Sequence, residues 1–238
     1  MAEPPAAEEP HQVADGADGS DDTDDTDDTR RAARLVGRLR RLHTVLGRVL
    51  LPGYLLYHLW EQWPALRGVE HWRSRVEAGP TGPVAAMLIA LPIVLHGCVG
   101  LGLALGAGTR HRHEDPQMAS LRPVRMITGG LVLLFLLYHL WHVGMLAPGP
   151  HATITTAFGR LWHDLGKPLP LVIYVVGVSA ACMHVGLGLS RVATDRLAAQ
   201  PLAARWAPLA VGVVVAPAWL MFMELIAFFA TGEGLWPG

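Results

Sequence analysis

The chain has 238 residues, of which 51% are hydrophobic and 16% are charged. A soluble domain of this size is rarely so apolar, so the composition argues against a soluble enzyme and favours an integral membrane protein. The net charge of −1 hides an asymmetry, because all nineteen Lys and Arg residues follow segment 1–29, which holds eleven acidic residues.

The acidic segment 1–29 contains the tract Asp21–Asp28 and very few apolar side chains. It cannot bury enough surface to offset the entropy of ordering, so we expect residues 1–37 to form a disordered acidic tail and a basic cytoplasmic flank. A docking segment for a basic partner is the alternative interpretation. No apolar core follows a basic start at Met1, so we do not expect a signal peptide.

Five apolar stretches follow, each long enough to cross about 30 Å of hydrocarbon as a helix of roughly 20 residues. They lie at 43–64, 83–107, 124–146, 168–191 and 208–230. Pro and Gly occur inside several of them, which membrane helices tolerate. The prediction is an all-α bundle of five transmembrane helices over residues 38–232, followed by a short outer tail over residues 233–238.

Basic residues are distributed unequally between the two sides of this bundle. Fourteen of them lie in the N-terminal flank and in the second and fourth connections, whereas the first and third connections hold five. By the positive-inside rule, the N-terminus is cytoplasmic and the C-terminus lies outside.

The first and third spans share a sequence repeat, LLYHLW, at Leu55–Trp60 and Leu136–Trp141. The second and fourth spans share a weaker, glycine-rich repeat that begins at His96 and His184. Spans one and three run in the same direction, as do spans two and four. The repeat therefore predicts two parallel two-helix units related by an axis along the membrane normal.

Each of the first four spans contains a histidine well inside its apolar stretch: His58, His96, His139 and His184. Ionisable residues at such depth are rare and usually functional. At 1.5 Å per residue, His58 and His139 lie roughly 10 Å from the outer ends of their helices. His184 lies roughly 10 Å, and His96 about 16 Å, from the inner ends. We therefore expect an outer pair, His58 with His139, and an inner pair, His96 with His184.

These pairs indicate two haems. Imidazoles on opposite sides of a flat macrocycle form bis-histidine haem ligation, and helix bundles build such sites from facing side chains. A bare zinc or copper site would need three or four ligands at one depth. Near the inner pair, five glycines would allow close approach of a helix or a porphyrin edge: Gly97, Gly100, Gly102, Gly186 and Gly188. A haem-free transporter with a histidine proton relay is a rival class.

Other polar residues are candidates for supporting roles. Anionic haem propionates need cationic partners, and four residues stand near the inner ends of the spans: Arg48, Arg125, Arg191 and His43. Quinone reduction needs a titratable group near the outer haem, for which we consider Glu61, His142 and Glu224. His142 lies three residues after His139 and could compete as a ligand, although the repeat favours His139.

Four segments resemble the single-chain, five-helix, dihaem cytochrome b anchors of bacterial succinate dehydrogenases and fumarate reductases. They are Arg41–Gly47 leading to His58, Leu91–Gly97, the run that ends at Trp141, and Tyr174–Val178 leading to His184. The resemblance covers about residues 38–230. In that family the first and third histidines hold the outer haem and the second and fourth hold the inner one, so the resemblance implies two haem b groups.

The resemblance also implies partners in a bacterial cytoplasmic membrane. An FAD flavoprotein, which carries the dicarboxylate chemistry, and an iron–sulfur subunit dock on the cytoplasmic face, and a dimer of such heterotrimers is one possible assembly. Electrons then pass through the inner and outer haems to quinone, often menaquinone. Some fumarate reductases of this type carry a glutamate two residues before the fourth histidine, where this chain has Cys182. The runner-up is a dihaem cytochrome b of a hydrogenase or formate dehydrogenase complex.

Overall fold

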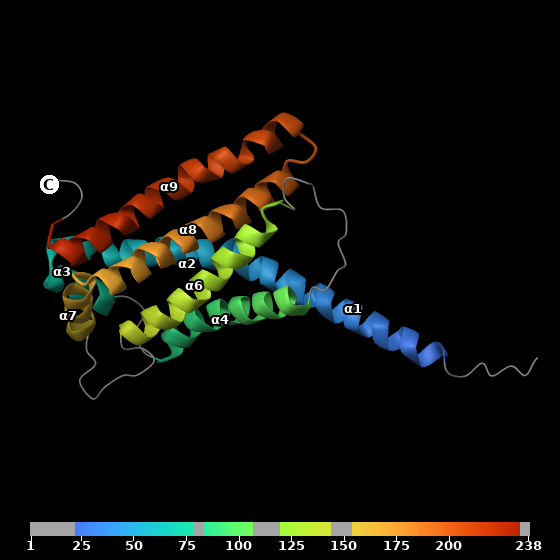
Figure 1. Ribbon diagram of the computed structural model, residues 1–238, viewed down its shortest axis with the longest axis horizontal. Coiled ribbons are helices and arrows are strands. Elements are labelled where there is room, and N and C mark those ends of the chain that lie inside the picture. Colours follow the sequence, from blue (N-terminus) through green and yellow to red (C-terminus); the bar gives the residue numbers. More distant parts are fainter. Residues whose placement is uncertain (1–21, 79–82, 107–119, 144–153, 234–238) are drawn as a thin grey trace, which may run out of the picture. The chain divides into compact units, whose positions relative to one another are not determined.

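The protein is built from helices. The computed structural model describes residues 22–78, 83–106, 120–143 and 154–233, and within these ranges there are helices and turns and no strand (Figure 1). The prediction of an all-α fold is therefore confirmed. The chain divides into two compact units, residues 1–38 and 39–238.

The first unit is described only in its helical part. Helix α1 (Asp22–Val45) begins inside the acidic tract, so its first turns include residues that we expected to be disordered. Residues 1–21, which hold the rest of the acidic tail, lie outside the described residues.

The first apolar span contains a wide turn. Helix α1 continues into the π-helical segment η1 (Leu46–Leu50) and then into α2 (Leu51–Gln62), with the backbone N–H of Leu51 donating to the carbonyl of Leu46. Pro52 has no N–H, and in a regular α-helix its ring would collide with the carbonyl four residues earlier. The π turn just before Pro52 relieves that conflict and keeps the span helical.

The remaining elements follow in chain order. They are η2 (Trp63–Arg67), α3 (Val69–Ala78), α4 (Pro83–Gly106), α6 (Arg122–His142), α7 (Ile154–Leu165), α8 (Pro168–Arg196) and α9 (Pro201–Thr231). Gly68 and Gly232 follow η2 and α9 with φ of +100° and +81°, a backbone region that glycine enters without strain. The short helices α3 and α7 lie in connections for which the sequence predicted no helix.

Among the described residues, three helices, α6, α8 and α9, are long and apolar enough to cross a membrane, and Leu91–Gly106 of α4 forms a shorter apolar helix. Their outward faces carry large apolar side chains, and Leu105, Leu134 and Val213 are 79%, 66% and 66% exposed. Water would make such faces costly, whereas lipid would not. The number of five spans and the orientation stay predictions.

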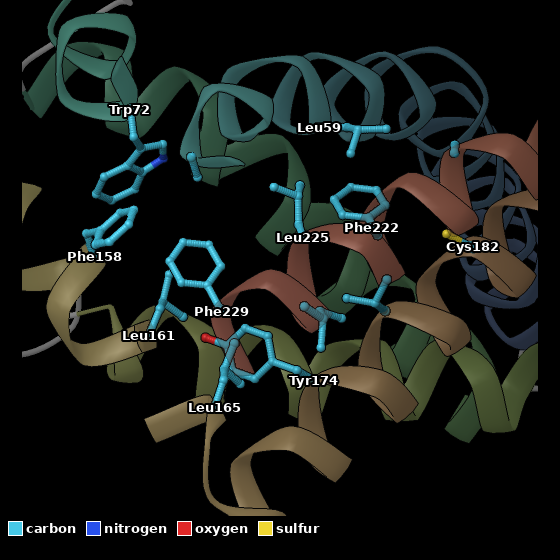
Figure 2. Packing of buried hydrophobic residues seen from close by; sticks show 14 residues of the cluster. Leu59, Trp72, Phe158, Leu161, Leu165, Tyr174, Cys182, Phe222, Leu225 and Phe229 are labelled. Atoms are coloured by element: carbon cyan, nitrogen blue, oxygen red, sulfur yellow. The ribbon is translucent and has the colours of Figure 1, made fainter. Parts of the chain in front are cut away.

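Helix α8 is central to the second unit, because it packs along both α6 and α9 (Figure 1). The buried hydrophobic cluster joins α8 and α9 to α2, α3 and α7. Figure 2 shows Leu225 and Phe229 near its middle and Tyr174 beside Leu165 at its lower edge. We call the end of the unit where α2, α6 and α9 finish the distal end. Much of the buried cluster lies there, so the outer histidine pair stands next to the best-packed part of the protein.

Candidate functional site

The four histidines of the spans form two pairs. The ring centroids of His58 (α2) and His139 (α6) are 6.0 Å apart at an interplanar angle of 80°. Those of His96 (α4) and His184 (α8) are 6.2 Å apart at 76°. Each pair thus joins two different helices, and the structure brings together the residues that the repeat had matched.

Both separations fit an iron atom held between two imidazoles. Two metal–nitrogen bonds of about 2 Å, plus roughly 1 Å from each ring centre to its nitrogen, amount to about 6 Å. Among the described residues, no group of three or more His, Cys, Asp or Glu side chains has a geometry that could hold a metal ion. Two facing imidazoles are the donor arrangement that bis-histidine haem ligation uses.

Hydrogen bonds at the inner pair use the Nδ1 atoms. Nδ1 of His96 lies 3.1 Å from the backbone oxygen of His43, so it must donate. Nδ1 of His184 lies 3.3 Å from Oγ1 of Thr128. The Thr128 hydroxyl donates its hydrogen to the carbonyl of Val124 at 2.8 Å and therefore accepts from His184. A neutral imidazole with a protonated Nδ1 has a free lone pair on Nε2, the nitrogen that a metal would bind.

The outer pair has a longer hydrogen-bonded environment. The hydroxyl oxygen of Tyr174 lies 3.0 Å from Nδ1 of His139 and 2.9 Å from Nδ1 of His142. Nε2 of His142 lies 3.0 Å from Oδ2 of Asp164, which α7 supplies. On the other side of the pair, Nδ1 of His58 lies 3.8 Å from a carboxylate oxygen of Glu61, too far for a hydrogen bond.

Asp164 is held in its charged form at the edge of this environment. Hydrogen bonds from Lys167, His142 and His163 keep the pKa of the Asp164 carboxyl well below its usual range. The Lys167 ammonium makes the shortest of these contacts, at 2.6 Å. A carboxylate with so low a pKa accepts hydrogen bonds and does not donate them.

Two glycines contact the inner histidines. A Cβ atom at Gly47 would lie 2.6 Å from Cε1 of His96, and one at Gly129 would lie 3.0 Å from Cε1 of His184. These two are not among the five glycines that the sequence indicated. They could have been found from their similar spacing to the repeated histidines, since Gly47 precedes His58 by eleven residues and Gly129 precedes His139 by ten.

The glycines chosen from the sequence have other neighbours. A Cβ at Gly100 would meet Nε2 of His43 at 2.8 Å, and one at Gly97 would meet Leu133 at 3.3 Å. A Cβ at Gly102 or Gly188 would meet nothing within 4 Å, so neither is required for close packing among the described residues.

The candidate propionate partners have different positions. The His43 ring stacks on His96 with centroids 4.0 Å apart, so it supports a proposed ligand directly. Arg48 is exposed on η1. Arg125 is half-buried near the start of α6, and Arg191 is half-buried near the end of α8. Arg125 also lies close enough to His184 to interact with it electrostatically.

The candidate proton-handling residues are separated by their surroundings. Glu61 is half-buried and accepts a hydrogen bond from the Tyr57 hydroxyl at 3.4 Å. Glu224 in α9 is only 5% exposed, and His142 is 6% exposed within the contacts described above. An open apolar hollow of about 420 Å³ lies at the distal end, and its lining contains none of the three: Gly68, Val69, Phe158, Gly159, Trp162 and Phe228.

Comparison with known proteins identifies one related subunit. The succinate dehydrogenase cytochrome b558 subunit of Bacillus subtilis (strain 168) is 27% identical over 154 residues, which cover 63% of this chain and 75% of the relative. No protein-family model and no solved structure matches the chain. The resemblance drawn from the sequence is confirmed by this similarity.

Proposed function

We propose that this chain, a relative of a succinate dehydrogenase cytochrome b subunit, is the membrane-anchoring dihaem cytochrome b of a succinate:quinone oxidoreductase. The observation that carries the proposal is the geometry of the two histidine pairs, whose centroids are 6.0 and 6.2 Å apart. Single buried histidines are common in protein cores, but two matched pairs with this spacing are not accounted for by packing.

In this proposal His58 and His139 hold the outer haem b, and His96 and His184 hold the inner one. Bound haem supplies a one-electron carrier, and the protein supplies orientation and electrostatics. The carbonyl of His43 and the hydroxyl of Thr128 keep the inner rings in the tautomer that leaves Nε2 unprotonated. Two pairs at two depths provide two successive electron-transfer sites across the bundle.

The wider assembly follows from topology and from the relative. Five spans with a cytoplasmic N-terminus place the basic connections on the inner face, where an iron–sulfur subunit and an FAD flavoprotein dock. The flavoprotein carries the succinate or fumarate chemistry, and this chain passes electrons to membrane quinone, which we take to be menaquinone. The membrane is the bacterial cytoplasmic membrane.

Quinone reduction also takes up protons, and we place Glu61 and Glu224 in that role. Glu61 lies one helical turn beyond His58, and Glu224 is a buried carboxyl of α9, a helix without a proposed haem ligand. A buried carboxyl is costly unless it is protonated or has partners, which is typical of functional membrane residues. His142 fits this role less well, because Tyr174 and Asp164 already occupy both of its nitrogens.

The test uses the complex purified with its native partners. The proposal expects two haems per chain in a pyridine haemochrome spectrum and co-purification of a flavin-containing subunit with succinate dehydrogenase activity. Replacing His58 or His139 with Ala removes the outer haem alone, and replacing His96 or His184 removes the inner haem alone. His71→Ala, at an exposed position in α3, is the control and retains both. A wild-type complex without haem would overturn the proposal, and a hydrogenase or formate dehydrogenase partner would establish the runner-up.

A further inference from the structure

A continuous chain of hydrogen bonds leads from the exposed end of α7 to His139. It runs from Asp164 to His142 at 3.0 Å, from His142 to Tyr174 at 2.9 Å, and from Tyr174 to His139 at 3.0 Å. Three helices contribute to it: α7 provides Asp164, α6 provides both histidines, and α8 provides Tyr174. The proposed function uses His139 as a ligand but assigns nothing to the other three residues.

The direction of each hydrogen bond follows from the charged end. The Asp164 carboxylate can only accept, so Nε2 of His142 carries a hydrogen. In the tautomer with its hydrogen on Nε2, His142 has an unprotonated Nδ1, which accepts the hydroxyl hydrogen of Tyr174. The Tyr174 oxygen in turn accepts from Nδ1 of His139, and the Nε2 of His139 is left with its lone pair.

The middle residues of this hydrogen-bonded series are buried. Tyr174 and His142 are 5% and 6% exposed, and Tyr174 lies in the buried cluster beside Leu165 (Figure 2). Hydrogen bonds in such surroundings polarise one another, because no water competes for the donors and acceptors. The negative charge of Asp164 therefore acts on the His139 ring through two intervening groups.

The other three proposed ligands lack this arrangement. Nδ1 of His96 donates to a neutral carbonyl and Nδ1 of His184 donates to a neutral hydroxyl. The nearest carboxylate oxygen to Nδ1 of His58 belongs to Glu61 and lies 3.8 Å away, beyond hydrogen-bond distance. Of the four proposed ligands, His139 is the one that hydrogen bonds of ordinary length between described residues connect to a carboxylate.

We propose that Asp164, His142 and Tyr174 are positioning residues that fix the tautomer of His139 and strengthen its bond to the outer haem iron. The inference rests on the proposed function, because it needs His139 to be an axial ligand. A strong hydrogen bond from Nδ1–H to an acceptor makes an imidazole more basic. A more basic ligand stabilises ferric over ferrous iron. We call Asp164, His142 and Tyr174 together the relay. The relay thus lowers the reduction potential of the outer haem and leaves that of the inner haem unchanged.

Sequence spacing explains how the relay is assembled. His139 and His142 are three residues apart on α6, so both rings project from one face of the helix. The ring centroid of each histidine lies 5.6 Å from the centroid of the Tyr174 ring. The charged end is added by α7, which turns directly into α8 through Lys167.

The experiment compares three variants in the purified complex. Tyr174→Phe keeps the ring and removes the hydroxyl, Asp164→Asn keeps the size and removes the charge, and Tyr138→Phe is the matched control. The Tyr138 ring stacks on His142 at 5.4 Å, but its hydroxyl has no place in the relay. Haem content is measured by pyridine haemochrome, the two midpoint potentials by redox titration, and the ligand field of each ferric haem by its EPR g values.

We expect Tyr174→Phe to favour reduction of the outer haem by on the order of tenfold, which is ~59 mV for a one-electron couple. Asp164→Asn shifts the same potential in the same direction by a smaller amount. The outer-haem g values change with the potential, whereas the inner haem and the Tyr138→Phe variant stay at wild-type values.

The outcomes separate this inference from the proposed function. If both haems are present and neither Tyr174→Phe nor Asp164→Asn moves the outer potential or g values, the relay has no effect and the inference fails while the function stands. If Tyr174→Phe loses the outer haem, Asp164→Asn decides alone, since its side chain does not touch His139. A wild-type complex without haem overturns the function, and the inference with it.

Discussion

Gly47 lies against the imidazole of His96 so closely that a Cβ atom would stand 2.6 Å from Cε1 of the ring. No real Cβ atom tolerates that distance, and the facing ring is itself fixed by the hydrogen bond from Nδ1 to the backbone of His43. A glycine at position 47 of η1 is thus a requirement of the inner histidine pair.

Replacing Gly47 with Ala is expected to disrupt the inner haem. The added methyl group must displace the His96 ring from its present position, and overpacking of this kind costs about 1–3 kcal/mol. Haem content and the inner midpoint potential report the change. Gly53→Ala is the control, because a Cβ at that position of α2 meets nothing within 4 Å. Equal haem loss in both variants would show that an added methyl group anywhere in the first apolar span reduces haem binding, whether or not it contacts His96.

Replacing Thr128 with Val is expected to raise the inner midpoint potential and to weaken inner haem binding. Val matches the shape of Thr but removes the hydroxyl that lies 3.3 Å from Nδ1 of His184, and the loss of a buried acceptor costs about 1–3 kcal/mol. Redox titration and the EPR g values of the inner haem are the measurements. Thr128→Ser restores the oxygen and should recover the wild-type values. A Thr128→Ser variant that behaves like Val would refute the role of the hydroxyl.

Replacing Gly177 with Ala is expected to destabilise the whole complex. A Cβ at Gly177 of α8 would overlap the ring of Phe135 on α6. Gly188→Ala is the control on the same helix, since a Cβ there meets nothing within 4 Å. Thermal unfolding in detergent is followed for both, and a variant at Gly177 as stable as wild type would contradict the close packing.

Replacing Glu61 and Glu224 with Gln separately tests the proposed proton path. With both haems intact, succinate-driven quinone reduction should fall at least tenfold in one of the two variants, and its pH dependence should change, because glutamine cannot exchange protons. Glu233→Gln, at an exposed position after α9, serves as the control. Wild-type rates and pH profiles in both variants would exclude these carboxyls and favour a quinone site near the iron–sulfur subunit.

The sequence predicted those features that repeat along it. Apolar runs marked α4, α6, α8 and α9, and the LLYHLW repeat matched His58 with His139 before any geometry was known. The relay could not be predicted in this way, because Asp164 belongs to a polar connection with no counterpart in the first half of the chain. Its contact with His142 depends on how α7 folds back beneath α6, and no periodicity encodes that.

His142 shows how a sequence can name a residue and miss its role. Its spacing from His139 suggested a competing ligand or a proton donor to quinone. In the structure both of its nitrogens are bonded, one to Tyr174 and one to Asp164. Tyr174 was noted only as the start of the segment Tyr174–Val178 that carries the family resemblance. A buried tyrosine hydroxyl reveals its partners only in three dimensions.

The π-helical turn at Leu46–Leu50 explains a difference in residue spacing between the first and third apolar spans. Eleven residues separate Gly47 from His58, whereas ten separate Gly129 from His139, and a π turn accommodates one residue more than an α turn. The surplus residue is absorbed as a bulge, so the glycine and the histidine stay in phase with their partners in both halves. The two halves of the chain therefore reach the same glycine-to-histidine arrangement with spacings of eleven and ten residues.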